Sequence, residues 1–80
     1  MKYFHYHITG DELAEPKGEI ASIPEGFIEY EVTLSGNSVY YKIENNKITE
    51  VVGEAIYEPA ARRRVNEFLA AYLATPPGAW

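Results

Sequence analysis

The chain has 80 residues, of which 46% are hydrophobic, with a formal net charge of −5 at pH 7 and no cysteine. This size predicts a single domain over residues 1–80, and the lack of cysteine excludes disulfides, thiolate metal sites and thiol nucleophiles. The acidic balance argues against nucleic-acid binding, which depends on basic side chains at phosphates, and no apolar run approaches the roughly 20 residues that cross a membrane.

The first segment, "KYFHYHITG", alternates along its length and predicts a strand over about residues 2–9. The alternation defines a core face with Phe4, Tyr6 and Ile8 and an outer face with Tyr3, His5 and His7. Two histidines at this spacing lie about 6.5 Å apart and can share a metal ion. Because the chain has no other histidine, carboxylates would have to complete such a site. We therefore predict no metal ion and no cofactor, and keep a metal site as the alternative.

Residues 10–26 contain two prolines and three glycines, and we predict an acidic loop here, with a short strand over 19–23 as an alternative. Residues 10–31 hold seven acidic side chains and only Lys17 as a base. The first acids also interrupt any signal-peptide core, which favours a cytoplasmic protein. We predict an acidic patch for a partner at Asp11, Glu12, Glu15 and Glu19.

The segment "FIEYEVTL" alternates and predicts a strand over about 27–34, followed by another over about 38–44. A two-residue turn at Gly36-Asn37 fits the positive φ angles that a tight hairpin requires. This turn would place Tyr30 opposite Ile43 on the core face.

A second turn at Asn45-Asn46 leads into a strand over about 47–57 that does not alternate cleanly. With Ile48 inward, simple alternation would also turn Glu50 and Glu54 into the core. A bulge at Thr49-Glu50 would leave both glutamates in water, and we favour it. The residues that then face inward are Val51, Gly53 and Ala55.

A C-terminal helix is predicted over about 59–74, because Pro59 suits a first turn and "TPP" ends the pattern before a tail at 75–80. Its apolar stripe consists of Ala61, Val65, Phe68, Leu69, Tyr72 and Leu73. The predicted fold class is α+β: an antiparallel meander of three to four strands with one amphipathic helix packed on one face.

Three arginines fill the first turn of this helix, where the macrodipole disfavours positive charge. One interpretation is internal pairing with Glu54, Glu58 or Glu67; the others are an acidic protein partner and a bound anion such as phosphate. Trp80 would either fold back over the edge of the core or anchor in the pocket of a partner. The candidate partner-binding residues are therefore Tyr3, His5, His7, Phe27, Tyr40, Arg62, Arg63, Arg64 and Trp80.

The chain offers no serine in a nucleophile elbow and no Gly-rich loop before a helix, so we predict that it is not an enzyme. We predict a small acidic, non-catalytic protein-interaction module that self-associates as a homodimer, or acts as an inhibitor or adaptor on a basic surface of a larger protein. The alternative is a small protein that binds a metal through His5 and His7 or an anion at the helix start.

Overall fold

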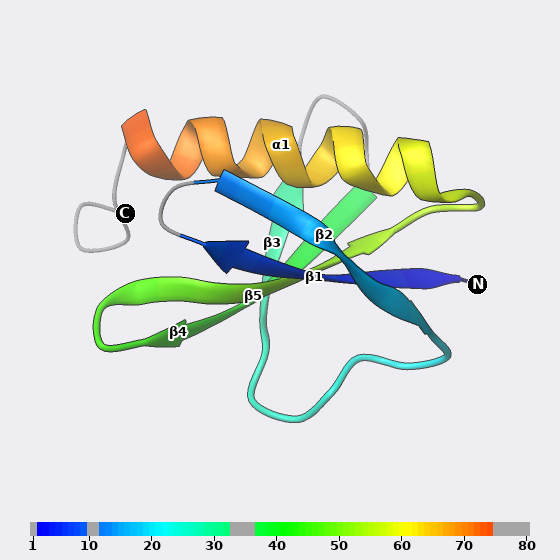
Figure 1. The fold of residues 1–80 in the computed structure, drawn as a ribbon, viewed down its shortest axis with the longest axis horizontal. Coiled ribbons are helices and arrows are strands. Elements are labelled where there is room, and N and C mark those ends of the chain that lie inside the picture. The colour runs from blue at the N-terminus through cyan, green and yellow to red at the C-terminus, as the bar shows by residue number, and fades with distance from the viewer. Residues whose placement is uncertain (1, 10–11, 33–36, 75–80) are drawn as a thin grey trace.

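The computed structural model describes residues 2–9, 12–32 and 37–74 (Figure 1). These residues form one open antiparallel sheet in the order β2-β1-β5-β4-β3, with a C-terminal helix packed on one face. The predicted α+β class is confirmed. The elements are β1 (Tyr3–Thr9), β2 (Glu12–Ile20), β3 (Ile28–Val32), β4 (Asn37–Glu44), β5 (Lys47–Glu54) and α1 (Glu58–Ala74).

The sheet has one strand more than the three or four predicted, because residues 12–20 form β2 and not a loop. β2 is an edge strand, where a proline such as Pro16 is tolerated because its missing backbone N–H does not interrupt the hydrogen bonds between two central strands. Two register shifts against β1 accommodate the irregular sequence, and Gly18 takes a φ of 143° beside one of them. The predicted short strand over 19–23 coincides with β2 only at its last two residues.

The predicted register of β3 with β4 is wrong, because Tyr30 pairs with Val39 and not with Ile43. The difference is an even number of residues, so each side chain keeps its predicted face. The ring of Tyr30 lies 5.0 Å from that of Phe68 on α1, and this contact favours the observed register. A prediction based on the turn sequence alone takes no account of a contact with the helix. Most of the predicted turn, residues 33–36, lies outside the described residues.

The second hairpin is confirmed, with φ angles of 54° at Asn45 and 64° at Asn46. The predicted bulge is also confirmed, because Ile43 pairs with Ile48 while Lys42 pairs with Glu50, which leaves Thr49 as the extra residue. One consequence was predicted wrongly: the Glu50 side chain is only 18% exposed and does not stand in water.

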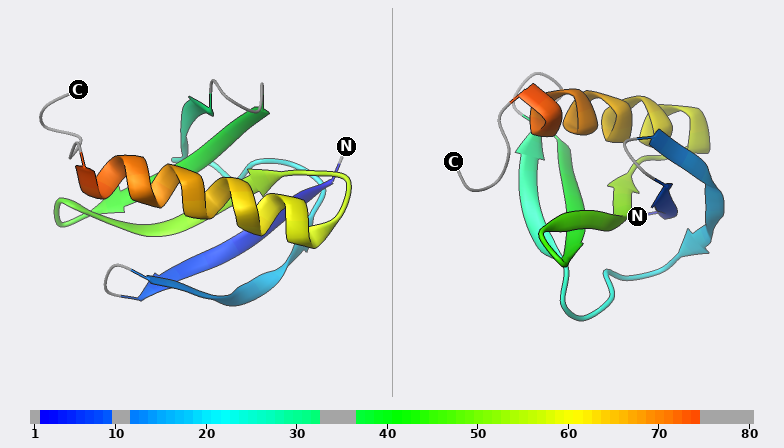
Figure 2. Two further views of the ribbon diagram at one scale, coloured as in Figure 1. Left: turned by 90° about the horizontal axis from the view of Figure 1, so that it is seen from above. Right: turned by 60° about the vertical axis from the view of Figure 1, so that its left-hand side comes forward.

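The main core lies between the sheet and α1. Gly53 of β5 lies directly beneath the helix, where an added Cβ would lie 3.1 Å from the carbonyl oxygen of Ala61 and from Cγ2 of Val65. The sheet curves so that β2 and β3 rise on either side of α1 (Figure 2). The predicted apolar stripe of α1 is buried at Ala61, Val65, Phe68 and Leu69, with Tyr72 partly buried and the Leu73 side chain outside the described set. Among the helices of the described residues, none combines the length and apolar composition needed to cross a membrane.

The face of the sheet opposite α1 is not bare. The connection 21–27 leaves β2 at one edge and reaches β3 at the other, and on its way it passes along this outer face (Figure 1). Val52 of β5 is fully buried although it does not belong to the cluster beneath the helix. The molecule therefore has a second, smaller apolar layer on the outer face.

Candidate functional site

The structure brings four of the sequence-predicted contact residues together on the outer face. Val52 is paired with His5 on β1 and with Tyr40 on β4. The rings of Tyr3 and Tyr40 meet edge to face at 6.2 Å, and those of His5 and Phe27 do so at 5.8 Å. His5 and Tyr40 flank Val52, and all four aromatic side chains are partly buried within the chain.

A cluster of charged side chains lies beside this aromatic layer, and we call it the Glu50 cluster. Its centre is the Glu50 carboxylate, whose Oε1 lies 2.8 Å from Nζ of Lys17 and 2.9 Å from Nε2 of His5. The His5 contact is close but poorly aligned for a hydrogen bond. Lys42 lies 4.0 Å from Oε2 and bridges to Glu44 at 3.1 Å. Side chains from β1, β2 and β4 thus converge on β5.

Partial burial and neighbouring charges set the protonation of the Glu50 cluster. The hydrogen bond from Lys17 lowers the pKa of Glu50, against the opposing effect of burial. Burial and the positive charge of Lys17 lower the pKa of His5, although Glu50 acts in the other direction. At neutral pH the cluster therefore consists of an ionised carboxylate between ammonium groups, with an uncharged imidazole beside it.

The sequence patterns do not reveal the Glu50 cluster. The bulge in β5 was predicted correctly, but Lys17, which pairs with Glu50, comes from β2, and residues 12–20 were predicted to be part of a loop. Lys17 is the extra residue in the first register shift of β2, between the pairs formed by Gly18 and Pro16. A bulge redirects one side chain, and here it lets Lys17 reach across β1 to Glu50.

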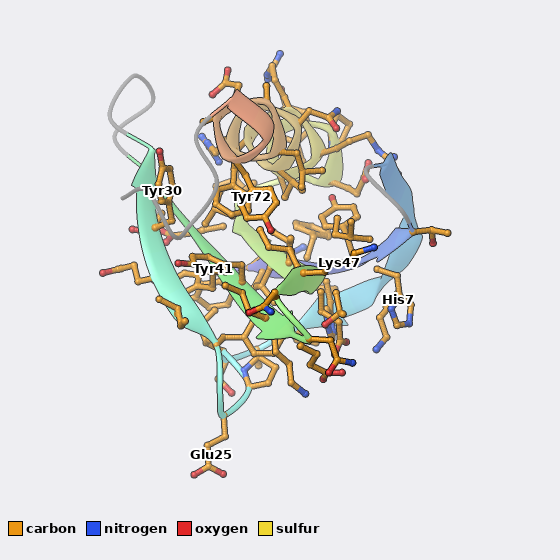
Figure 3. The ribbon with its side chains drawn as sticks, turned by 90° about the vertical axis from the view of Figure 1, so that its left-hand side faces the viewer. His7, Glu25, Tyr30, Tyr41, Lys47 and Tyr72 are labelled. Atoms are coloured by element: carbon orange, nitrogen blue, oxygen red, sulfur yellow. The ribbon has the colours of Figure 1, made fainter. Side chains whose placement is uncertain are left out.

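His7 does not share the surroundings of His5. Its side chain is exposed and points away from the sheet beside β2 (Figure 3), whereas the imidazole of His5 is held between Glu50 and Phe27. Within residues 2–9, 12–32 and 37–74, no group of three or more histidine and carboxylate side chains is placed to hold a metal ion.

The three arginines of α1 point to different partners. Arg62 donates to Glu58 Oε1 at 3.0 Å and lies 5.6 Å from the centre of the buried Tyr6 ring. Tyr6 also donates to this oxygen at 3.0 Å, and burial together with this bond raises the pKa of Tyr6. Arg64 donates to the carbonyl oxygen of Glu54.

Arg63 is exposed and makes no ion pair with a described residue. It borders a shallow groove along the outward side of α1, together with Arg62, Asn66 and Glu67. Because Arg62 and Arg64 are occupied inside the chain, the three guanidinium groups do not form one anion site.

The glutamates of residues 12–31 lie on β2, on the connection 21–27 and on β3. Glu12, Glu15 and Glu19 of the predicted patch lie on β2, where Glu19 is 3.7 Å from Lys2 and the other two side chains are not among those described. Asp11 and Trp80 lie outside the described residues. Glu25 on the connection 21–27 and Glu29 on β3 are exposed, and Glu25 points away from the molecule (Figure 3).

Comparisons of the chain with protein-family models, with curated proteins and with solved structures find no match. Function must therefore be inferred from the chemistry of these surfaces.

Proposed function

We propose that this protein is a small acidic, non-catalytic interaction module that binds a basic surface of a larger protein, as an inhibitor or an adaptor. The observation that carries the proposal is an uninterrupted acidic segment. Residues 18–41 include four glutamates and neither lysine nor arginine. They form the end of β2, the connection 21–27, β3 and the first half of β4. We call Glu25, Glu29 and Glu31 the acidic strip, because they follow one another along the connection and β3.

The ion pairs among the described residues leave the charges of Glu25 and Glu29 uncompensated. Lys2, Lys17 and Lys42 each lie within 4.0 Å of a glutamate elsewhere in the sheet. Glu25 and Glu29 make no ion pair with a described residue, although Glu29 accepts a hydrogen bond from Tyr40 at 3.2 Å. A negatively charged surface attracts a positively charged partner, speeds its association and disfavours acidic partners.

The Glu50 cluster and the Tyr6 hydroxyl favour a structural role over catalysis. Glu50 is ionised between two lysines, and the Nε2 atom of His5 faces this carboxylate. The Tyr6 hydroxyl is enclosed beneath the helix by Glu58 and Arg62. A general acid or base needs access to a substrate, and the side chains of His5, Glu50 and Tyr6 are at least largely enclosed by their neighbours.

Self-association is a second candidate, supported by a different observation. Ile56 is 82% exposed and the adjacent Tyr57 is 51% exposed, in the connection between β5 and α1. Adjacent exposed apolar side chains are typical of contact surfaces. Sedimentation of Ile56→Ser against the native chain tests this candidate, because a dimer made there should dissociate more readily in the variant.

The main proposal is tested by charge reversal at matched sites. Tagged native protein and the Glu25→Lys, Glu29→Lys and Glu67→Lys variants are used to capture proteins from a lysate of the source cells, with elution by increasing salt. Glu67 is the control, since it is exposed on α1 and the substitution changes the charge by the same amount. We expect one basic protein to bind the native chain and the Glu67 variant but to elute earlier from the other two. Equal retention by all four proteins would contradict the proposal.

A further inference from the structure

The two edges of the sheet differ in their ability to accept another strand. β2 contains Pro16, which lacks a backbone donor, and Gly18 at positive φ, and it has two register shifts. Irregularity of this kind protects an edge from pairing. β3 pairs with β4 through five consecutive residues without a shift, and its other side has no strand partner among the described residues. Figure 2 shows β3 at the margin of the sheet in both views.

The side chains of β3 define what such a strand would have to look like. "IEYEV", residues 28–32, alternates apolar and acidic residues. Ile28 is 48% exposed on the same side of the sheet as Tyr30, while Glu29 is exposed on the outer side. An added strand would therefore meet the apolar side chains of Ile28 and Tyr30 on the helix side and the carboxylate of Glu29 on the outer side.

Side-chain contacts also hold β3 in a fixed conformation. Tyr30 packs against Phe68, and Tyr40 of β4 donates to Glu29 across the hairpin. Tyr30, Tyr41 and Tyr72 gather between β3 and α1 (Figure 3). An edge that is already formed requires little ordering when a partner binds.

We infer that β3 accepts a strand from the partner, and that this strand alternates lysine or arginine with apolar residues. Backbone hydrogen bonds along residues 28–32 would provide affinity, and the basic side chains would lie opposite Glu29 and Glu31. The inference rests on the proposed function, because it specifies how the acidic strip recognises a basic protein.

A second copy of this chain fits the edge poorly. The antiparallel pairing with the greatest overlap centres on Tyr30, and it places Glu29 of each copy opposite Glu31 of the other. Like charges directly opposite each other destabilise a strand pair, and this pairing contains two such contacts. A basic segment converts the same two positions into attractive pairs.

The test uses the full chain, labelled with ¹⁵N, and three blocked synthetic peptides. The first alternates lysine and valine, the second has the same composition with its lysines in one block, and the third is the first peptide with alternate backbone nitrogens methylated. We expect the alternating peptide to shift the amide signals of residues 28–32 and to slow their hydrogen exchange. Methylation removes backbone donors without changing charge, and we expect it to weaken binding at least about tenfold. Glu29→Lys should weaken binding of the alternating peptide, and the matched Glu67→Lys change should not.

The outcomes separate this inference from the proposed function. If all three peptides bind equally, strand addition is wrong and recognition by charge alone stands. If none binds while Glu29→Lys still loses the protein captured from lysate, strand addition is again wrong and the proposed function stands. If no peptide binds and no charge-sensitive partner is captured, both fail. Protection of residues 28–32 in a dimer of the protein alone would assign the edge to self-association and overturn the inference.

Discussion

Nζ of Lys17 lies 2.8 Å from Oε1 of Glu50, so an ion pair joins edge strand β2 to β5 across the intervening strand β1. The Lys17 side chain is 36% exposed and that of Glu50 is 18% exposed, so solvent screens the pair only in part. Because Lys17 occupies the bulge of β2, its contact with Glu50 depends on the register of this strand.

Replacement of Lys17 by Met should destabilise the fold by about 1 kcal/mol, because a mostly buried carboxylate loses its principal hydrogen-bond donor. Urea denaturation at pH 7 measures the change. Lys2→Met is the matched control: its pair with Glu19 is longer, 3.7 Å, and both side chains are at least half exposed, so we expect a loss below about 0.5 kcal/mol. Equal losses of unfolding free energy in the two variants would show that the Lys17–Glu50 pair stabilises the fold no more than an exposed surface pair does.

Acidification should lower the free energy of unfolding in two steps. Folding lowers the pKa of His5 from its ordinary value of 6.5 and that of Glu50 from 4.5. At each group the unfolded chain binds more protons, so stability falls as the pH falls. The contribution of His5 is complete above pH 6.5 and is lost as the pH drops through its lower folded value. The contribution of Glu50 is lost in the same way below pH 4.5.

Urea denaturation between pH 7.5 and 3.5 tests this dependence. His5→Gln should flatten the slope between pH 7.5 and 5 while leaving the second step. His7→Gln, a change at an exposed neighbour on the same strand, should keep both steps. If the unfolding free energy of His5→Gln still falls between pH 7.5 and 5 as it does in the native chain, the first step belongs to another titrating group.

Gly53→Ala should destabilise the fold by about 1–3 kcal/mol, because the new Cβ would lie 3.1 Å from the Ala61 carbonyl oxygen and from Val65 Cγ2. One of these contacts is helix backbone, which cannot move without shifting α1 away from the sheet. Thermal unfolding measures the loss, and Gly53→Val should lose more than Gly53→Ala. Unchanged transitions in both variants would mean that the helix packs less closely on β5 than described.

Substitutions in the β4–β5 turn should change the stability of the fold only through the backbone conformation that the new residue favours. Asn45 and Asn46 both have positive φ, at 54° and 64°, and both are exposed. Asn46→Gly should preserve or raise stability by up to about 1 kcal/mol, whereas Asn45→Ala should lower it by about 1–2 kcal/mol. Chemical denaturation of both variants checks the opposite signs. The bond from Tyr72 to the carbonyl of Asn46 does not involve the replaced side chain.

Local patterns predicted those parts of the protein whose partners are near in sequence. Alternation placed Phe4 and Tyr6 in the core, the asparagine pair specified the second turn, and the mismatch in β5 required a bulge. Helical periodicity assigned the buried side of α1. Each of these features depends on a few neighbouring residues, so local sequence patterns are sufficient to predict them.

Contacts between distant segments decided the rest. Residues 12–20 became a strand because β1 offered a free edge, although Pro16 and Gly18 favour a loop in isolation. The register of β3 follows a contact between Tyr30 and a helix nearly forty residues later. Glu50 is partly buried because Lys17 and His5 reach it from other strands, and the connection 21–27 passes along the outer face. Such long-range pairings compete in energy with local preferences, and only the folded arrangement shows which of them prevail.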